Sequence, residues 1–326
     1  MEILHRFLRS TAVPLFHPFA PTERIFLLYL AGALVLAVFV FWADPAVSKQ
    51  RPVPGFFRYC FPKAIYFHRS AVMDYMYFVF YKMFFFFLVI PFLITQQAVA
   101  GRVLEVFSKI HPPLGIQPSL PVLFTFVFTL SAFVIADFGI FLAHYLQHKV
   151  PVLWEFHKVH HSAEVLTPMT VYRMHPVDDI LSATLVSLFA GFFSGFWLYF
   201  FDQPGRMITL MGVNMFVFAY YLFGYNLRHS HIWLSYGPFW SRILISPAQH
   251  QIHHSVAREH VDKNIGFVFS FWDELFGTLV VPDRKLDIEY GLRHGEDKEF
   301  QFVGRLFLLP FKKCLQKWGP FRKPSS

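Results

Sequence analysis

The sequence predicts an all-α integral membrane protein with about four to five transmembrane helices. Hydrophobic residues make up 55% of the chain and charged residues 15%, whereas average soluble domains carry about 25% charged residues. One soluble core of this size cannot bury all 44 phenylalanines. Five apolar runs approach the roughly 20 residues that a helix needs to cross a bilayer, and histidine-rich polar segments follow them.

The five apolar runs are taken as candidate spans in chain order. They are Ile25–Ala43, Asp74–Ile94, Val122–Ala143, Leu181–Phe201 and Met207–Phe223. Only the segment "DQPGR" separates the last two runs, so they are predicted to form a tight helical hairpin. The first run is long enough to span and has no small-residue cleavage site behind it, so we expect no cleavable signal peptide.

Cysteine content and charge exclude other classes. Cys60 and Cys314 form neither a disulfide framework nor a CxxC pair. The net charge of +8 is interpreted as membrane topology and not as nucleic-acid affinity, because the basic residues lie in loops and in the tail beside apolar runs. With Met1–Arg24 placed outside, 22 Lys and Arg residues lie on the side of the histidine motifs and six on the other. This bias predicts that the histidines face the cytoplasm.

Three histidine motifs predict a metal site. The chain contains "HYLQH", and it contains an HxxHH pattern twice, in "HKVHH" and "HQIHH". Residues at i and i+4 lie ~6 Å apart on one helix face, and the adjacent pair in HxxHH can diverge toward two neighbouring ions. These motifs supply eight imidazoles, namely His144, His148, His157, His160, His161, His250, His253 and His254. That number exceeds what one tetrahedral zinc ion uses and suits two ions with positions left for water or oxygen.

Ligand type narrows the choice of metal. Neutral imidazole binds Fe, Zn, Cu and Ni, and carboxylates are scarce around these motifs. Iron is favoured because redox chemistry would explain why so many histidines gather at one site. Zinc has no redox chemistry, but it suits the same nitrogens and is expected as a possible occupant of purified or crystallised protein.

Several further motifs accompany the histidines between "DFGIFLAHYLQH" and "NIGFVFSFWDELFGT", residues 137–278. They are "YRMHP", an "HS" before a "GP" turn, "SPAQHQIHHS" and the closing "WDELFGT". In these motifs the chain resembles the fatty acid hydroxylase and sterol desaturase superfamily of membrane-bound non-haem di-iron enzymes. The resemblance implies a cytosolic helical cap that holds a poly-histidine dimetal centre. It also implies a lipid hydroxylase or desaturase that uses O2 and two electrons. Its substrate would be a sterol, an alkylglycerol ether, a fatty acyl chain or an amino-acid-containing lipid.

The same resemblance implies a division of the chain and a ligand set. We expect an N-terminal membrane region with two spans at 1–120, a catalytic domain with three spans at 121–282 and a basic tail at 283–326. Carried over position by position, the metal ligands are His144, His148, His157, His160, His161, His229, His250, His253 and His254.

A second group of residues is predicted to contribute further ligands or to support the ligands. On a helix, His229 and His231 would point about 200° apart, so one of them is expected to be the ligand, and the family pattern favours His229. Asp137 lies two helical turns before His144, where an unpaired acid in a membrane helix is costly. The candidates are His231, His175, Asp137, Asn226 and Asp273, followed by Asp178, Asp179 and Asn264.

Electrons are expected from a separate partner. The chain has neither the His-Pro-Gly-Gly of a fused haem-type donor nor a GxGxxG nucleotide motif. A reductase, a ferredoxin, a cytochrome or a reduced pterin therefore remains open as the redox partner.

Two alternatives lie outside oxidation. One is a zinc-dependent lipid hydrolase or a structural metal-binding membrane protein. The other is a metal transporter, which would place its ligands midway along the spans, whereas these motifs follow the span ends. The expected location is a bacterial inner membrane, and otherwise the endoplasmic reticulum.

Overall fold

The computed structural model describes residues 16–44 and 55–318, and within them the chain is mostly helical, with one two-stranded sheet. Three helices are long and apolar enough to cross a membrane: α6 (Arg69–Leu88), α8 (Pro121–Lys149) and α10 (Pro176–Phe201). The apolar helix α2 (Leu27–Ala43) is shorter, at 17 residues. The predicted all-α membrane class is confirmed, with three long helices and one shorter apolar helix in place of four to five spans.

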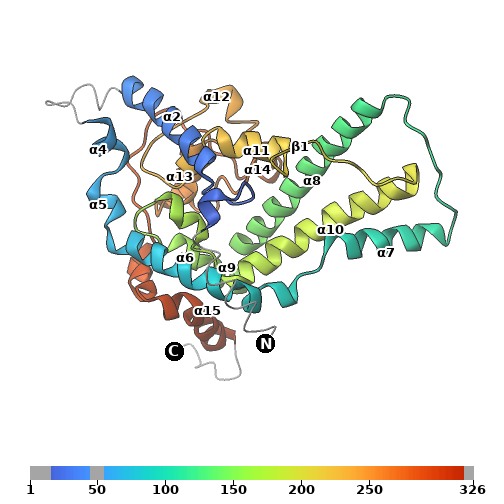
Figure 1. Ribbon diagram of the computed structural model, residues 1–326. Coiled ribbons are helices and arrows are strands. Elements are labelled where there is room, and N and C mark those ends of the chain that lie inside the picture. Colours follow the sequence, from blue (N-terminus) through green and yellow to red (C-terminus); the bar gives the residue numbers. More distant parts are fainter. Residues whose placement is uncertain (1–15, 45–54, 319–326) are drawn as a thin grey trace.

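The long helices α8 and α10 form an arm that projects from a compact helical cap, whereas α6 lies against the cap (Figure 1). In the arm, α10 packs between α8 and α7 (Gln96–Ser108). Gly191 and Gly195 allow the backbones of α10 and α7 to approach closely, because a Cβ at either position would lie within 2.8 Å of a carbonyl oxygen of α7. The sequence did not predict α7, since its polar residues interrupt the apolar pattern.

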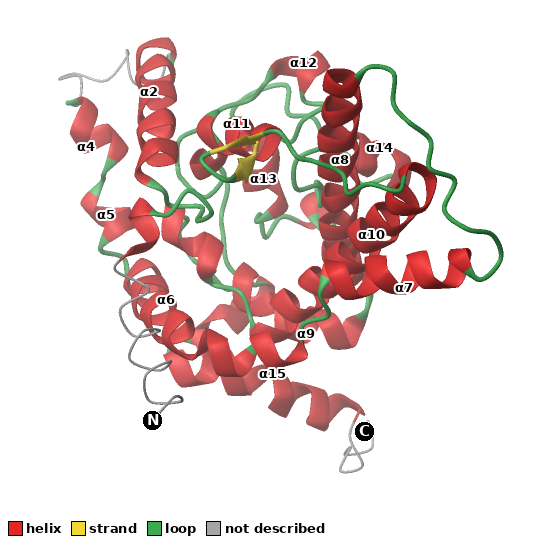
Figure 2. Ribbon diagram, turned by 45° about the vertical axis from the view of Figure 1, so that its right-hand side comes forward, coloured by secondary structure: helices red, strands yellow, loops and turns green. Residues whose placement is uncertain are grey.

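The cap contains the short helices and turns. Its α-helices are α4 (Phe56–Cys60), α5 (Lys63–Tyr66), α9 (Pro151–His161), α11 (Met215–Leu222), α12 (Gly237–Trp240), α13 (Pro247–His253), α14 (Phe271–Phe276) and α15 (Val303–Trp318). Its 3-10 turns are η1 (His17–Phe19), η3 (Pro168–Tyr172), η4 (Tyr225–Leu227), η5 (Arg258–His260) and η6 (Arg293–Phe300), while η2 (Ile90–Phe92) joins α6 to the segment before α7. Figure 2 shows α9 and α15 side by side at the base of the cap.

The predicted fifth span, Met207–Phe223, is wrong. This segment forms the strands β1 (Thr209–Leu210) and β2 (Val213–Asn214), which pair antiparallel, and then the eight-residue helix α11. The turn between the strands uses positive φ angles at Met211 and Gly212, which a continuous helix excludes. The side chain of Asn214 then accepts a hydrogen bond from the Phe216 N–H and starts α11. Consequently there is no helical hairpin of the fourth and fifth runs.

The second predicted span is displaced along the chain. The helix α6 begins at Arg69, because the His68 side chain caps it by accepting a hydrogen bond from the Ser70 N–H at 3.2 Å. It ends at Leu88, shortly before Pro91. The chain then continues through η2 into α7 alongside α10 (Figure 1).

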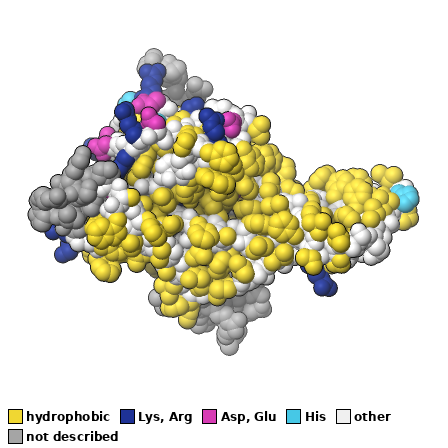
Figure 3. Space-filling view, turned by 90° about the horizontal axis from the view of Figure 1, so that it is seen from above, with side chains coloured by type: hydrophobic (Ala, Val, Ile, Leu, Met, Phe, Trp, Pro, Cys, Tyr) yellow, Lys and Arg dark blue, Asp and Glu magenta, His cyan; other side chains and the backbone are white. Residues whose placement is uncertain are grey.

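Large apolar side chains cover the arm. Leu123 and Phe192 are each 52% exposed, and the view in Figure 3 is dominated by hydrophobic surface. Most of the charged side chains in that view gather at the end away from the projecting arm. An apolar surface of this extent is expected where helices contact lipid, so the chain is a membrane protein.

The segment before α2 lies on the histidine side of the molecule. Arg24 donates to the Val171 carbonyl at 3.5 Å, and its own carbonyl accepts from Asn226 at 3.0 Å. Val171 and Asn226 both belong to the histidine-bearing region of the chain. The expectation that Met1–Arg24 lies on the opposite side therefore fails at Arg24, because these tertiary contacts hold it beside the histidines.

Candidate metal centre

The structure brings together all nine histidines that the sequence singled out as metal ligands. They form two clusters, and within each cluster one ligating atom per residue lies within 4.8 Å of the others. The five-histidine cluster consists of His144, His148, His157, His161 and His253. The four-histidine cluster consists of His160, His229, His250 and His254.

Helix geometry divides each HxxHH motif between the clusters. Adjacent residues point about 100° apart around a helix, so His160 and His161 at the end of α9 separate into different clusters. His253 and His254 separate in the same way at the end of α13. That helix is started by Ser246 and Gln249, which bond each other's backbone N–H in a capping box.

The distances between ring nitrogens fit ligands of a shared ion. In the four-histidine cluster, the Nε2 of His229 lies 3.4 Å from that of His160 and 3.0 Å from that of His250. In the five-histidine cluster, the Nε2 atoms of His144 and His157 are 3.1 Å apart. Nitrogens in neighbouring positions around an ion with bonds of about 2.0–2.1 Å lie roughly 2.9–3.4 Å apart.

Among the residues that the structure describes, three Nε2 atoms of the five-histidine cluster have no hydrogen-bond partner. The Nε2 atoms of His148, His161 and His253 are buried and unpaired. A buried polar atom without a partner costs about 1–3 kcal/mol. A metal ion between them would satisfy all three lone pairs, so the donor set fits a metal.

Burial lowers the pKa of several clustered histidines and so favours their neutral form. Burial lowers the pKa of His253 to about 3. Burial, followed by the neighbouring imidazoles, holds the pKa of His160, His161 and His254 well below the ordinary value of 6.5. Neutral imidazole is the form that binds metal ions, so no proton has to be displaced near neutral pH.

The loop 262–266 orients the five-histidine cluster. His144 Nδ1 donates to the Ile265 carbonyl at 2.6 Å, and His253 Nδ1 donates to the Lys263 carbonyl at 2.8 Å. His148 Nδ1 lies 3.2 Å from a carboxylate oxygen of Asp262. These bonds leave each Nε2 for the centre of the cluster. Sequence reasoning missed Asp262, which lies more than 100 residues from His148 in the chain.

Asp137 and Asp273 support this loop without contacting a histidine of either cluster. Asp137 accepts hydrogen bonds from the N–H groups of Val268 and Phe269 and from the Trp272 indole. Asp273 accepts from the N–H groups of Ile265 and Gly266 and from the Thr278 hydroxyl. Ile265 in turn accepts from His144, so these bonds connect Asp273 to the five-histidine cluster. Asn264 accepts from the Val280 N–H and fixes the end of the same loop.

Three other candidates lie outside both clusters. His231 donates from Nε2 to the Tyr59 carbonyl at 2.7 Å. His175 caps α10 by accepting from the Val177 N–H, and its Nε2 lies 3.1 Å from the Phe307 carbonyl. Asn226 bonds the Arg24 carbonyl. Asp178 lies closer to the site, with its carboxylate 3.5 Å from His157 Nδ1.

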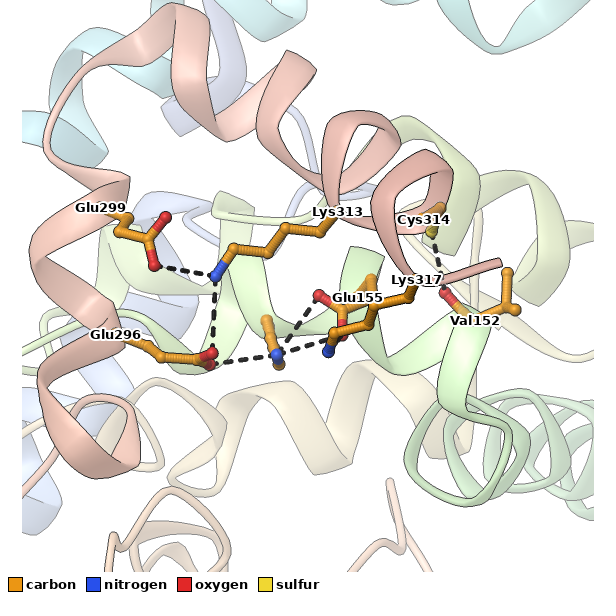
Figure 4. Close-up of polar contacts among 8 residues, drawn as sticks. Val152, Glu155, Glu296, Glu299, Lys313, Cys314 and Lys317 are labelled. Carbon is orange, nitrogen blue, oxygen red and sulfur yellow. Dashed lines mark hydrogen bonds and ion pairs between the residues drawn. The ribbon is translucent and has the colours of Figure 1, made fainter. Parts of the chain in front are cut away.

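Ion pairs between Lys and Glu side chains connect the outer face of α9 to the C-terminal helix α15 (Figure 4). Glu155 is 1% exposed and accepts hydrogen bonds from Lys158 and from Lys317 of α15. Lys158 also pairs with Glu296 at 3.0 Å, and Glu296 pairs with Lys313 at 3.5 Å. Since α9 carries three of the nine histidines, these ion pairs fix part of the metal centre from outside. No sequence pattern indicated them.

A cavity of about 120 Å³ lies against both clusters. Five of the nine histidines line it, together with the apolar side chains of Ile140, Val171 and Phe267. Arg24, Asp179 and Ser182 add a polar wall. The cavity therefore gives a small substrate group access to both histidine clusters.

Comparison with known proteins identifies the central region. Residues 129–278 match the family model described as fatty acid hydroxylase. The chain is 29% identical over 164 residues to alkylglycerol monooxygenase of Homo sapiens, covering 50% of this chain and 33% of that protein. It is 30% identical over 159 residues to ornithine lipid hydroxylase of Rhizobium tropici, covering 49% and 44%. It is 28% identical over 205 residues to Delta(7)-sterol 5(6)-desaturase of Eremothecium gossypii, covering 60% and 50%.

These matches spread over one half or less of each relative's length, and no solved structure matches the chain significantly. The matched segment contains all nine clustered histidines and the loop that orients them. Its lipid-oxidising relatives agree with the resemblance inferred from the motifs. The comparisons therefore confirm that residues 129–278 are similar to the fatty acid hydroxylase family, as the motifs indicated.

Proposed function

We propose that this protein is a membrane-bound di-iron oxidoreductase that uses O2 and two electrons to hydroxylate or desaturate a lipid. The observation that carries the proposal is the convergence of nine histidines into two buried clusters. Three relatives are named for the oxidation of an alkylglycerol, an ornithine lipid and a sterol, which supports the same reaction class.

The five-histidine cluster would hold one iron ion and the four-histidine cluster the other. A bound iron pair supplies the redox chemistry that activates O2 against a C–H bond. In hydroxylation, one oxygen atom enters the C–H bond and the other leaves as water with two electrons and two protons. In desaturation, the substrate loses two hydrogens and both oxygen atoms leave as water, again with two external electrons and two protons.

The protein's own residues position the lipid. A carbon placed in the cavity would lie against His144, His157, His160, His229 and His250. The walls formed by Ile140, Val171 and Phe267 are apolar and exclude water from the reacting carbon. The loop 262–266 holds the rings through their Nδ1 atoms, so the ligand geometry is preorganised.

The location and the electron supply belong to the same proposal. We place the histidine side at the cytoplasmic face, in a bacterial inner membrane or otherwise in the endoplasmic reticulum. Electrons would come there from a separate reductase, ferredoxin, cytochrome or reduced pterin. A transporter is disfavoured because the ligands gather at the end of α8 and in the cap, away from the middle of the long helices.

Metal analysis and oxygen uptake test the proposal together. Protein purified in detergent after growth with added iron should contain about two iron ions per chain, as two clusters require. The reduced, iron-loaded protein should then consume O2 when a total membrane lipid extract is added. An iron-loaded, reduced protein that consumes no O2 with any lipid fraction would end the oxidoreductase proposal. A protein that binds only zinc and hydrolyses a lipid would favour the hydrolase alternative.

A further inference from the structure

The cavity beside the two clusters contains a cation that ligand binding does not use. Arg24 lines the cavity, although it lies far outside residues 129–278 of the family match. It comes from the turn that precedes α2 and reaches the cavity beside Val171 and Phe267. Arg24 is thus a feature of this chain that the shared family region does not contain.

The guanidinium of Arg24 lies beside the Tyr221 hydroxyl and within electrostatic range of Asp179, but its direct contacts are weak. It donates to the Val171 carbonyl at 3.5 Å, and its carbon lies 5.9 Å from the centre of the Phe267 ring. In the described part of the chain, no carboxylate forms an ion pair with it, since Glu23 pairs with His17 at 2.7 Å and with Lys82 at 3.5 Å. A guanidinium held away from water without an anion is costly, and its planar fork suits carboxylate or phosphate.

The other charged groups of the cavity are already engaged. Arg228 donates to the Phe267 carbonyl at 2.6 Å and contacts His250 Nδ1 at 2.8 Å. Asp179 accepts a hydrogen bond from the Tyr81 hydroxyl. With two arginines and one aspartate on the lining, the cavity favours a negatively charged group, and Arg24, unlike Arg228, forms no hydrogen bond with a clustered histidine in the described part of the chain.

The size of the cavity limits the distance between the bound anion and the oxidised carbon. Arg24 and the five histidines line this one space of about 120 Å³. A group bound to Arg24 and a carbon facing the histidines would therefore lie in the same cavity.

We propose that Arg24 determines substrate specificity by binding the carboxylate or phosphate of an anionic lipid, which is oxidised near that group. This inference rests on the proposed lipid oxidation and names its substrate class. It excludes an uncharged sterol, which has no anionic group for Arg24 to bind, and it excludes oxidation in the middle of a long acyl chain, far from the head group.

Binding of simple amphiphiles tests the role of Arg24 without iron or turnover. Dodecyl phosphate, dodecanoate and 1-dodecanol share one chain and differ in the head group, and their affinities for the detergent-solubilised protein can be measured by thermophoresis. The wild-type protein should bind at least one of the two anions about ten-fold or more tighter than 1-dodecanol, as expected for a charge-assisted hydrogen bond. R24Q should abolish this preference, whereas R24K should retain most of it.

A matched control is R102Q on α7, where the arginine is 72% exposed and pairs with Glu105. R102Q removes one positive charge, as R24Q does, but at a position outside the cavity. Its preference for anions should therefore equal that of the wild type. A preference for the phosphate or for the carboxylate supports the proposal in either case and identifies the anion. Equal binding of 1-dodecanol by the wild type, or an unchanged preference in R24Q, would overturn it.

The outcome can be separated from that of the proposed function. Suppose that R24Q loses the anion preference but the reduced, iron-loaded protein consumes no O2 with any lipid. The anion site at Arg24 is then supported, and the proposed lipid oxidation is refuted. If the wild type oxidises lipids and R24Q keeps the preference for anions, lipid oxidation is supported and the proposed role of Arg24 is refuted.

Discussion

At the scale of single residues, adjacent histidines serve different clusters. His160 and His161 are neighbours on α9, yet each belongs to its own cluster, and His253 and His254 repeat this arrangement on α13. The 100° step between neighbouring helical residues allows one motif to bridge two sites. Each HxxHH motif therefore joins the two clusters, and the loss of one histidine should affect mainly one of them.

The variant His254→Ala should lose the ion of the four-histidine cluster and retain the other. We expect metal content to fall from about two ions to about one per chain, with loss of lipid oxidation, while the protein still inserts into the membrane. Elemental analysis of the purified variant measures this. His231→Ala is the control, because His231 bonds the Tyr59 carbonyl outside both clusters and its loss should leave metal content unchanged. Two retained ions in His254→Ala would refute its assignment as a ligand.

At the scale of elements, close helix packing holds the arm together. Gly191 of α10 faces α7, and a Cβ there would lie 2.5 Å from Val99 Cβ and 2.8 Å from the Gln96 carbonyl oxygen. Backbone cannot yield as a flexible side chain does, so the two helices would have to separate. By contrast, Gly101 of α7 has no atom within 4 Å of such a Cβ.

Two glycine-to-alanine variants should therefore have opposite effects on stability. Gly191→Ala should destabilise the protein by about 1–3 kcal/mol through overpacking. Gly101→Ala should stabilise it by about 0.5–1 kcal/mol, because alanine is the better helix former and nothing obstructs it. Thermal unfolding in detergent measures both. A Gly191→Ala protein as stable as the wild type would mean that α7 and α10 are not packed this closely.

A second element, α15, is attached to α9 by ion pairs that depend on pH. Burial pulls the pKa of Glu296 upward, but hydrogen bonds and charges from Lys158 and Lys313 outweigh it, so the pKa lies below the ordinary value of 4.5. The ionised Glu296 consequently stabilises the fold at pH values above 4.5, and this stabilisation is lost as pH falls through the lowered pKa.

Hydrogen exchange in α15 should thus increase below pH 4.5, after correction for the intrinsic rate of exchange. Glu296→Gln should show raised exchange in α15 already at pH 7 and a weaker dependence on pH. The exposed Glu259 provides the matched control, since Glu259→Gln should behave as the wild type does. Identical exchange in Glu296→Gln and in the wild type would show that these ion pairs do not hold α15.

At the scale of the whole molecule, the apolar arm and the polar cap divide the protein. The loop between α7 and α8 lies at the far end of the arm (Figure 1). The turn η5 follows closely after α13, which carries the clustered His250 and His253. The excess of Lys and Arg on the histidine side supports placing the cap in the cytoplasm.

Cysteine labelling checks this orientation in a chain with Cys60→Ala and Cys314→Ala. A membrane-impermeant maleimide should label Gln117→Cys, in the α7–α8 loop, in intact bacterial cells. It should label Arg258→Cys, in η5, only after the membrane is opened. Both positions are exposed, so access to them depends on the bilayer. Labelling in the reverse order would place the histidines outside the cytoplasm.

Local patterns in the sequence determined the membrane class and the histidines that gather in the clusters. Hydropathy over about 20 residues and helical periodicity depend only on neighbouring residues, and the HxxHH motifs are visible for the same reason. The misassigned fifth span, Met207–Phe223, shows the limit of hydropathy, because turn geometry at Met211 and Gly212 prevailed over an apolar composition.

Only the tertiary structure decided how distant segments complete the site. Arg24 contacts Val171 across 147 positions of the chain, and Asp262 contacts His148 across 114. Glu155 of α9 and Lys317 of α15 meet across 162 positions. Such contacts are fixed by the packing of the whole chain and leave no periodic trace in the sequence, so the wall of the cavity and the orientation of the ligands could not be predicted from it.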